Sequence, residues 1–456
     1  MGSLFSIAII ISIFGSCAQI GLPTGGVKDT LAPKLVRASP SYGSVNVTNS
    51  KITFEFNEYI DVQDLQQNLL ISPLQNRNPI IITNPRSISL KFRDSLLPNT
   101  TYNINFGNAI KDINEGNIYQ NFTYAFSTGA FIDSNFITGK VILAETGLYD
   151  STLIVMLYTN AVDTTVLKKK PNYIAKVNSD GTFRFNNLPN TTFNIYALKD
   201  GDGGKTYNSK AEIFAFANKK INSNSNITLY AYAEQKAIAN TITTNAVAGV
   251  IRSATEKKLR YNTNLTGAQD LLQPLEITFT NALKNIDTNK IYIADTFYKR
   301  LPNVKFSLDS TAKVIRFNTA WSPATPLKLV IAQTAVTDSA NVSLTKSDTI
   351  TFNTKREEDY GRLILRFNDI DLTKNPVIQF VVSDAIKMAF PITSTEFVSK
   401  RFPPGDYTVR ILYDKNKDGV WTPGNYTQQL QPELVVTLPQ KLSIRADWDN
   451  EREINL

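Results

Sequence analysis

The 456-residue chain contains no histidine, one cysteine (Cys17) and three methionines. Without histidine, neither a Ser-His-Asp nor a Cys-His catalytic arrangement can form, and a zinc site with histidine ligands is excluded as well. Any catalysis would have to use carboxylates, Ser or Lys nucleophiles, or metal ions held by oxygen ligands. A single cysteine also excludes a disulfide within the chain, so buried cores must supply the stability of the folded domains.

The chain also lacks dense clusters of positive charge, although its formal net charge is +8. The two strongest clusters are Lys168-Lys169-Lys170 and Lys355-Arg356, and neither alternates with aromatic residues. A nucleic-acid groove combines basic residues with aromatic side chains that stack on bases. We therefore expect no nucleic-acid partner.

Long apolar runs are missing except at the N-terminus, where residues 4–14 are almost entirely apolar and Gly15-Ser16 precede Cys17. This run is too short for a transmembrane helix, which needs about 20 residues, but it suits a secretory signal. The pattern resembles the lipobox of bacterial lipoproteins. The resemblance implies that residues 1–16 are a signal peptide and that Cys17 carries acyl chains such as palmitate, which anchor the protein to a membrane. Met1-Gly2-Ser3 supplies no basic residue, which leaves open a start further upstream.

Between the turn residues, short segments alternate in polarity. Ile52, Phe54 and Phe56 share one face of a predicted strand, and Tyr102, Ile104 and Phe106 share one face of another. Alternation with turn signals every 8–12 residues is typical of sandwiches or barrels of short strands. The pattern predicts an all-β protein whose one short helix lies around Gln63–Leu70.

Residues 32–129 resemble the bacterial Ig-like domain of surface-layer and Bacteroidota envelope proteins. The motifs that carry the resemblance are Pro33-Lys34-Leu35-Val36, Asn57-Glu58, Leu97–Tyr102 and Phe126–Gly129. The preceding segment, 17–31, is similar to the linker that follows the lipidated cysteine in Bacteroidota outer-membrane lipoproteins.

Residues 130–229 resemble the prealbumin-like, or carboxypeptidase-regulatory-like, β-sandwich, on the basis of Ser179–Phe185 and Phe193–Leu198. The same order then repeats, because Leu275–Asn281 corresponds to Ile52–Asn57 and Phe402–Asp414 to Leu188–Asp200. We therefore predict tandem β-sandwiches in which Ig-like and prealbumin-like domains alternate. After the first pair come a connector (230–269), a second Ig-like sandwich (270–355) and a second prealbumin-like sandwich (356–456).

Asp414, Asn416 and Asp418 have the Asp-x-Asn-x-Asp-Gly spacing of a calcium loop. The twelfth position of a complete loop needs Glu, but it is Asn425 here. The flanks, including Val420-Trp421, are predicted to be strands. A hairpin turn in which Asp and Asn accept backbone N–H groups is the favoured interpretation, with Ca²⁺ as the alternative cofactor.

Carboxylates also gather at Glu55, Glu58, Asp61 and Asp64. A glycosidase would need two of them across a cleft. Strand alternation places Glu55 opposite Phe54 and Phe56, on a solvent-facing side, so we predict that the chain is not an enzyme and has no catalytic residues.

Exposed tyrosines and tryptophans are a better indication of binding, because these rings give rigid contact area to partners or sugars. The candidates are Tyr149, Tyr158, Tyr173, Tyr207, Tyr261, Tyr292, Tyr298, Trp321, Trp421 and Tyr426. Core packing is the alternative for each ring.

Asp-Ser or Asp-Thr recurs before a small or aliphatic residue and is similar to the O-glycosylation pattern of Bacteroidota envelope proteins. The acceptors would be Thr30, Ser95, Ser151, Thr164, Ser310, Ser339 and Thr349. Turn formation is the alternative explanation.

Together these features predict a lipid-anchored outer-membrane lipoprotein that acts as a non-catalytic binding or scaffold subunit. The expected partner is an integral outer-membrane protein or a multi-subunit envelope complex for secretion, uptake or barrel assembly. A cell-surface adhesin or glycan-binding protein is the alternative, followed by a carboxylate-dependent hydrolase. Residues Ala18–Gly21 lack an acidic cluster, and no Asp follows Cys17, so the outer membrane is favoured and its face stays open.

Overall fold

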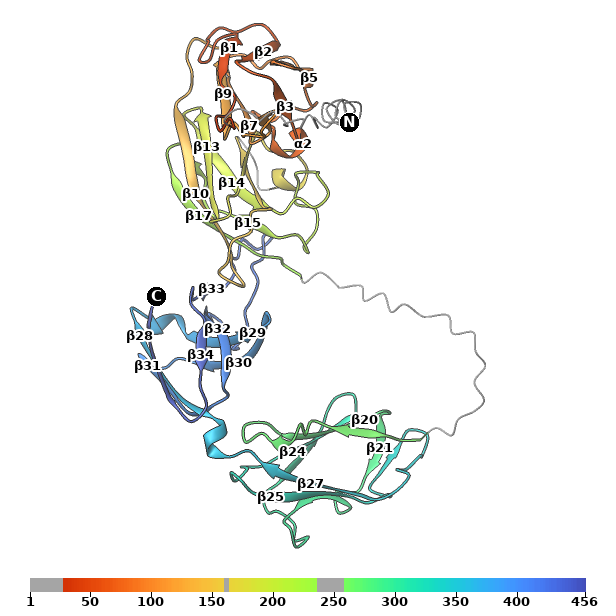
Figure 1. The fold of residues 1–456 in the computed structure, drawn as a ribbon. Coiled ribbons are helices and arrows are strands. Elements are labelled where there is room, and N and C mark those ends of the chain that lie inside the picture. Colours follow the sequence, from red (N-terminus) through yellow and green to blue (C-terminus); the bar gives the residue numbers. More distant parts are fainter. Residues whose placement is uncertain (1–27, 160–163, 236–257) are drawn as a thin grey trace, which may run out of the picture. The chain divides into compact units, whose positions relative to one another are not determined.

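The computed structural model describes residues 28–159, 164–235 and 258–456. Cys17, the predicted site of acylation, lies outside these residues. The chain divides into two compact units, one formed by Met1–Ile142 and Tyr149–Ala231 and the other by Leu143–Leu148 and Tyr232–Leu456. Both units are built almost entirely from antiparallel strands, which confirms the predicted all-β class of tandem β-sandwiches (Figure 1).

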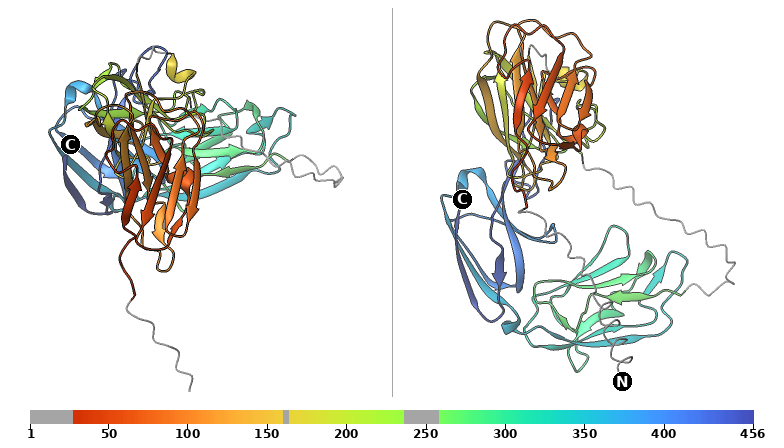
Figure 2. Two further views of the ribbon diagram at one scale, coloured as in Figure 1. Left: turned by 90° about the horizontal axis from the view of Figure 1, so that it is seen from above. Right: turned by 45° about the horizontal axis from the view of Figure 1, so that its top comes forward.

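The first sandwich has two facing sheets and a two-stranded ribbon, with strand orders β1-β2-β6-β5, β4-β7-β9 and β3-β8. The strands are β1 (Leu35–Ser39), β2 (Lys51–Phe56), β3 (Ile60–Val62), β4 (Leu70–Ser72), β5 (Ile80–Asn84), β6 (Ser87–Lys91), β7 (Thr101–Gly107), β8 (Ile110–Asp112) and β9 (Phe122–Ser127). The red and orange strands of this sandwich lie side by side in both views of Figure 2. Ile52, Phe54 and Phe56 are buried in its core, as the alternation predicts. The predicted helix is shorter than expected and covers only α2 (Leu65–Asn68).

The second sandwich pairs a sheet of order β13-β10-β17 with a sheet of order β12-β11-β14-β15, in which β16 also pairs with β14. Its strands are β10 (Asn135–Leu143), β11 (Ile154–Tyr158), β12 (Tyr173–Lys176), β13 (Thr182–Leu188), β14 (Thr192–Leu198), β15 (Phe214–Phe216), β16 (Ile221–Asn222) and β17 (Asn226–Ala231), with a 3-10 turn η1 at Thr165–Leu167. Gly181 has φ +79°, a left-handed conformation that explains why the predicted Asp180-Gly181 turn uses glycine.

The third sandwich has sheets of order β18-β20-β24-β23, β19-β27-β25-β22 and β21-β26, which follow those of the first except that β19 adds a fourth strand parallel to β27. Its strands are β18 (Tyr261–Thr263), β19 (Ala268–Gln269), β20 (Leu275–Phe279), β21 (Leu283–Ile286), β22 (Ile291–Ala294), β23 (Lys305–Leu308), β24 (Val314–Asn318), β25 (Pro326–Ile331), β26 (Val336–Asp338) and β27 (Asp348–Thr354). β20 therefore occupies the place of β2, which matches the correspondence between Leu275–Asn281 and Ile52–Asn57.

The fourth sandwich repeats the sheet orders of the second, as β31-β28-β35 and β30-β29-β32-β33, with β34 also paired to β32. Its strands are β28 (Gly361–Asn368), β29 (Pro376–Val382), β30 (Ala385–Pro391), β31 (Glu396–Phe402), β32 (Gly405–Tyr413), β33 (Leu434–Thr437), β34 (Leu442–Ile444) and β35 (Asp449–Asn455), with 3-10 turns η2 (Glu357–Asp359) and η3 (Leu372–Lys374). Val420-Trp421 is not a strand, so that prediction is wrong; both residues belong to the long loop between β32 and β33. No helix in the described part of the chain is long and apolar enough to cross a membrane.

Candidate functional site

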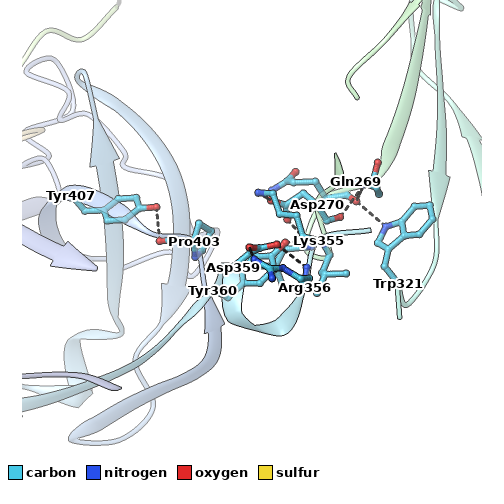
Figure 3. Close-up of polar contacts among 12 residues, drawn as sticks. Gln269, Asp270, Trp321, Lys355, Arg356, Asp359, Tyr360, Pro403 and Tyr407 are labelled. Atoms are coloured by element: carbon cyan, nitrogen blue, oxygen red, sulfur yellow. Dashed lines mark hydrogen bonds and ion pairs between the residues drawn. The ribbon is translucent and has the colours of Figure 1, made fainter. Parts of the chain in front are cut away.

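The third and fourth sandwiches are joined by the aromatic ring of Tyr360. This residue belongs to the fourth sandwich in sequence, but its ring packs in the core of the third. Tyr360 directly precedes β28, is 3% exposed and forms part of the third sandwich's hydrophobic core. Its hydroxyl oxygen accepts the backbone N–H of Leu271 at 2.7 Å. Figure 3 shows Tyr360 beside Lys355 and Asp270. We call Asp270, Leu271, Lys355 and Tyr360 the joint.

An ion pair stabilises the joint in addition to the packing of Tyr360. Lys355 Nζ lies 2.7 Å from Asp270 Oδ2 and 5.5 Å from the centre of the Tyr360 ring. Burial raises the pKa of Asp270, but the hydrogen bonds that its carboxylate accepts, including those from Lys355 and the N–H of Leu272, outweigh burial and lower it. Burial and the nearby Asp270 carboxylate raise the pKa of Tyr360, so this hydroxyl stays neutral at physiological pH.

A second contact closes the joint from outside. Arg401 Nε on β31 donates to both carboxylate oxygens of Glu357, at 2.8 and 2.9 Å, and this contact lowers the pKa of Glu357. The backbone N–H of Arg356 donates to Asp359 Oδ2 at 2.8 Å, which holds the η2 turn in shape. The short segment between β27 and β28 is therefore fixed at both ends and forms a stiff connection instead of a free linker.

The first and second sandwiches are joined by hydrogen bonds between side chains. Thr101 Oγ1 on β7 donates to Asp133 Oδ2 at 2.8 Å. Asn103 Nδ2 donates to Asn187 Oδ1 at 2.8 Å, and Asn187 Nδ2 donates to the carbonyl of Asp133 at 2.9 Å. Two neighbouring positions of one strand therefore contact the next domain, which again favours a stiff pair.

The predicted calcium loop has its carboxylates engaged by the backbone. The carboxylate of Asp414, 2% exposed, accepts the N–H groups of Lys417 and Gly419, each at 2.7 Å. Asn416 Nδ2 donates to Asp418 Oδ2 at 3.0 Å, and the N–H of Val420 donates to Asp418 Oδ1. Among the described residues, no group of three or more Asp, Glu, Cys or His side chains is arranged to hold a metal ion. In these contacts Asp side chains accept backbone N–H groups within the loop, and Ca²⁺ binding stays a prediction.

Sequence inspection missed the acidic residue that completes this loop. Glu433, 4% exposed, lies beyond the loop at the start of β33 and accepts the N–H groups of Lys415 and Thr422. No spacing motif connects position 433 to positions 414–418, so only the fold could reveal this residue.

The acidic residues of the first sandwich differ in their surroundings. Glu55 lies on the outer face of β2 and its nearest cation is Arg37, at 4.0 Å. Burial, followed by the charges of Asp112 and Asp29, raises the pKa of Glu58. Asp112 is engaged by the N–H groups of residues 115–117. Asp61 forms an ion pair with Lys111, and Asp64 precedes α2.

The aromatic candidates divide into core and surface rings. Tyr158, Tyr173, Tyr207, Trp321 and Tyr426 are buried; Tyr261, Tyr292 and Trp421 are half-buried; Tyr149 and Tyr298 are exposed. Trp321 Nε1 donates to the carbonyl of Gln273 at 3.0 Å, and Trp421 Nε1 donates to that of Glu433 at 2.8 Å. Both indole N–H groups are therefore engaged within the fold.

The seven predicted O-glycosylation acceptors are all exposed, namely Thr30, Ser95, Ser151, Thr164, Ser310, Ser339 and Thr349. Some of the preceding carboxylates form turns: Asp309, for example, accepts the N–H groups of Thr311, Lys313 and Val314. Turn formation and exposure are compatible with each other, and modification stays a prediction.

The apolar edge of the first sandwich was not among the sequence candidates. β5 ends the sheet order β1-β2-β6-β5, and Ile80 and Ile82 on its outer face are 41% and 56% exposed. The strand contains no charged residue. The sequence feature that could have indicated this edge is the run Ile80-Ile81-Ile82 between Pro79 and Pro85. A strand with one face in solvent normally alternates apolar and polar residues, and this run does not.

Residues 29–128 match the family model described as bacterial Ig-like domain, which agrees with the resemblance stated for 32–129. Comparison with curated proteins finds no match. Among solved structures, native alpha-2-macroglobulin from Escherichia coli is 14% identical, with 40% of this chain and 72% of that chain covered, at a TM-score of 0.21. The major pilin subunit BcpA of Bacillus cereus is 10% identical, with 71% and 99% covered, at 0.17. A DUF3823 family protein from Parabacteroides merdae is 12% identical, with 49% and 100% covered, at 0.15.

Proposed function

We propose that this protein is a non-catalytic scaffold and binding subunit, anchored to the outer membrane through acylated Cys17, within a complex that contains an integral outer-membrane protein. The tandem sandwiches and the joint at Tyr360 support a scaffold, because they hold neighbouring domains in fixed pairs. The N-terminal pattern that resembles a Bacteroidota lipoprotein supports the anchor.

The observation that carries the proposal is the outer edge of β5. An edge strand presents unpaired N–H and C=O groups, and it pairs with another chain unless charge, proline or a bulge prevents this. β5 contains no charged residue and exposes Ile80 and Ile82. A partner strand added here would gain backbone hydrogen bonds and cover both isoleucines.

Two other edge strands in the described part of the chain carry charges, which β5 lacks. β31 carries exposed Glu396 and Lys400, and β35 carries exposed Asp449, Glu451 and Arg452. Charges on an edge oppose pairing with a further strand because they would have to be desolvated or brought near like charges.

The test is gentle detergent extraction from the native membrane of a tagged copy, followed by identification of the proteins that co-purify. We expect stoichiometric recovery of an outer-membrane barrel protein with the wild-type chain and loss of that protein from Ile82→Lys. Val398→Lys is the matched control, since Val398 is a similarly exposed aliphatic residue on the already charged edge β31. Cys17→Ala should release the chain from the membrane.

Two results would contradict the proposal. If the protein were recovered alone and still bound to the membrane, the proposal of a complex would be wrong. The adhesin alternative would then be favoured. If Ile82→Lys and wild type recovered the partner equally, β5 would not be the edge that binds the partner.

A further inference from the structure

A tight turn in the third sandwich presents the most exposed large apolar side chain of the described residues. Phe297 is 88% exposed and its neighbour Tyr298 is 54% exposed. The turn, Asp295–Arg300, follows β22 and closes through a bridge between Ala294 and Arg300. We call it the aromatic turn.

The aromatic turn is rigid. Asp295 Oδ1 accepts the N–H groups of Phe297 and Lys299, each at 2.9 Å, and the N–H of Asp295 donates to the carbonyl of Lys299. Tyr298 has φ +66°, a left-handed conformation that is unfavourable for a bulky residue and persists only where the surroundings enforce it. Phe297 is thus held out into solvent by its own backbone.

Basic side chains lie within and beside the aromatic turn. Lys328 Nζ on β25 lies 3.8 Å from the centre of the Tyr298 ring and donates to the carbonyl of Thr296 at 3.1 Å. The guanidinium of Arg300 lies 4.4 Å from the centre of the Tyr292 ring, and Lys299 is exposed. The one carboxylate of the turn, that of Asp295, already accepts two backbone N–H groups.

We propose that the aromatic turn is a membrane-contact site, which inserts Phe297 among acyl chains while Lys299, Arg300 and Lys328 meet anionic lipid headgroups. An apolar tip with a cationic collar matches the polarity profile of an anionic bilayer surface, where aromatic residues occupy the interface and basic residues bind headgroups. A protein partner fits less well, because interface hot spots lie at the centre of a broad, well-packed patch. The residues that flank Phe297 and Tyr298 in the chain are Thr296, Lys299 and Arg300, and two of these three are basic.

This contact depends neither on acylation of Cys17 nor on β5. It can therefore be tested on the chain from Ala18 to Leu456, which keeps every described residue but lacks the apolar N-terminal run. The probe is co-sedimentation with vesicles of phosphatidylcholine, with and without phosphatidylglycerol. We expect binding only to the vesicles that contain phosphatidylglycerol, and weakening by added salt.

Phe297→Ser should weaken binding roughly tenfold or more, since it removes the apolar group that inserts. Lys299→Glu should weaken it as well, since it reverses one collar charge. Phe131→Ser and Lys313→Glu are matched controls: Phe131 is 69% exposed between β9 and β10, and Lys313 is exposed in the turn between β23 and β24. Both controls should bind like wild type. Because all four side chains are exposed, thermal unfolding of every variant should match wild type.

Insertion is distinguished from surface adsorption by Phe297→Trp, whose added fluorescence should be quenched by brominated acyl chains in the bilayer. Three results would overturn the proposal: no binding of the wild-type chain to anionic vesicles, equal binding of Phe297→Ser and wild type, or an added emission of the Phe297→Trp variant that brominated lipid leaves unchanged. Loss of a protein partner from Phe297→Ser, with vesicle binding unchanged, would assign the turn to protein recognition.

Discussion

The hydroxyl of Tyr360 accepts the backbone N–H of Leu271 at 2.7 Å, although Tyr360 opens the fourth sandwich and Leu271 belongs to the third. One side chain thus satisfies a buried donor of another domain and fills part of that domain's core. The two sandwiches should therefore unfold as one cooperative unit, and the joint should be where their coupling is most sensitive to substitution.

Tyr360→Phe should destabilise this unit by about 1–3 kcal/mol, because the buried N–H of Leu271 loses its acceptor. Tyr360→Ala should cost about 3–5 kcal/mol, because it also empties the space of the ring. Urea unfolding measures both. Tyr292→Phe is the control, since the Tyr292 hydroxyl has no hydrogen-bond partner among the described residues. A Tyr360→Phe variant as stable as Tyr292→Phe would show that the hydrogen bond contributes nothing.

The joint should weaken in acid. The pKa of Asp270 is lower in the folded protein than in the unfolded chain, where it is about 3.9. The stabilisation is therefore fully present above the unfolded value and is lost as the pH falls through the folded value. Asp270→Asn should remove this part of the acid dependence, as measured by thermal unfolding between neutral and acidic pH. Parallel profiles for Asp270→Asn and wild type would contradict the assignment.

Alkaline pH should destabilise the first unit. Burial raises the pKa of Tyr124 and of Tyr173 to about 12, and Tyr124 also donates its hydroxyl proton to the carbonyl of Pro40 at 2.7 Å. Since the folded values lie above the unfolded value of about 10, this stabilisation is complete below about pH 10 and is lost as the pH rises toward the folded values. Ultraviolet titration of tyrosinate should show late-ionising tyrosines in the native protein, and these should be absent in urea.

Local alternation predicted the strands that bury one face. Thr101–Phe106 was expected as a strand and is β7 (Thr101–Gly107); Ile52–Phe56 was expected and is β2 (Lys51–Phe56). The prediction of a strand at Val420-Trp421 was wrong because these two apolar residues lie in a loop. Trp421 packs against the cluster of Val377, Leu412 and Val435. A single buried side chain in a loop produces no periodic pattern in the sequence. The alternation that identifies strands reports one buried face, not backbone pairing.

The candidate sites were harder to predict than the strands, since exposure depends on the fold. Trp321 and Tyr298 were equally plausible surface rings in the sequence, yet Trp321 is 5% exposed and Tyr298 is 54% exposed. Nothing near either residue in the sequence distinguishes them. The joint was equally hidden, because Asp270 and Lys355 are far apart in the chain and meet only when β19 pairs with β27.

Gly139 on β10 and Gly361 on β28 test the internal duplication. The strand β28 takes the place of β10 in the repeated sheet order, and both glycines lie where another chain segment approaches closely. A Cβ at position 139 would lie 2.0 Å from the carbonyl oxygen of Ile227, and one at position 361 would lie 2.3 Å from that of Arg445. Both obstacles are backbone atoms, which cannot rotate away as a side chain can. Gly139→Ala and Gly361→Ala should each lower the free energy of unfolding by about 1–3 kcal/mol or more, because the added methyl group overpacks the site.

Gly201→Ala is the control, because a Cβ there meets nothing within 4 Å, and its effect should stay within about 0.5 kcal/mol. Urea unfolding should place the Gly139 effect in the first unit and the Gly361 effect in the second. If either alanine variant matched Gly201→Ala, the close approach at that glycine would not constrain its identity, and the duplication would rest on sheet order alone.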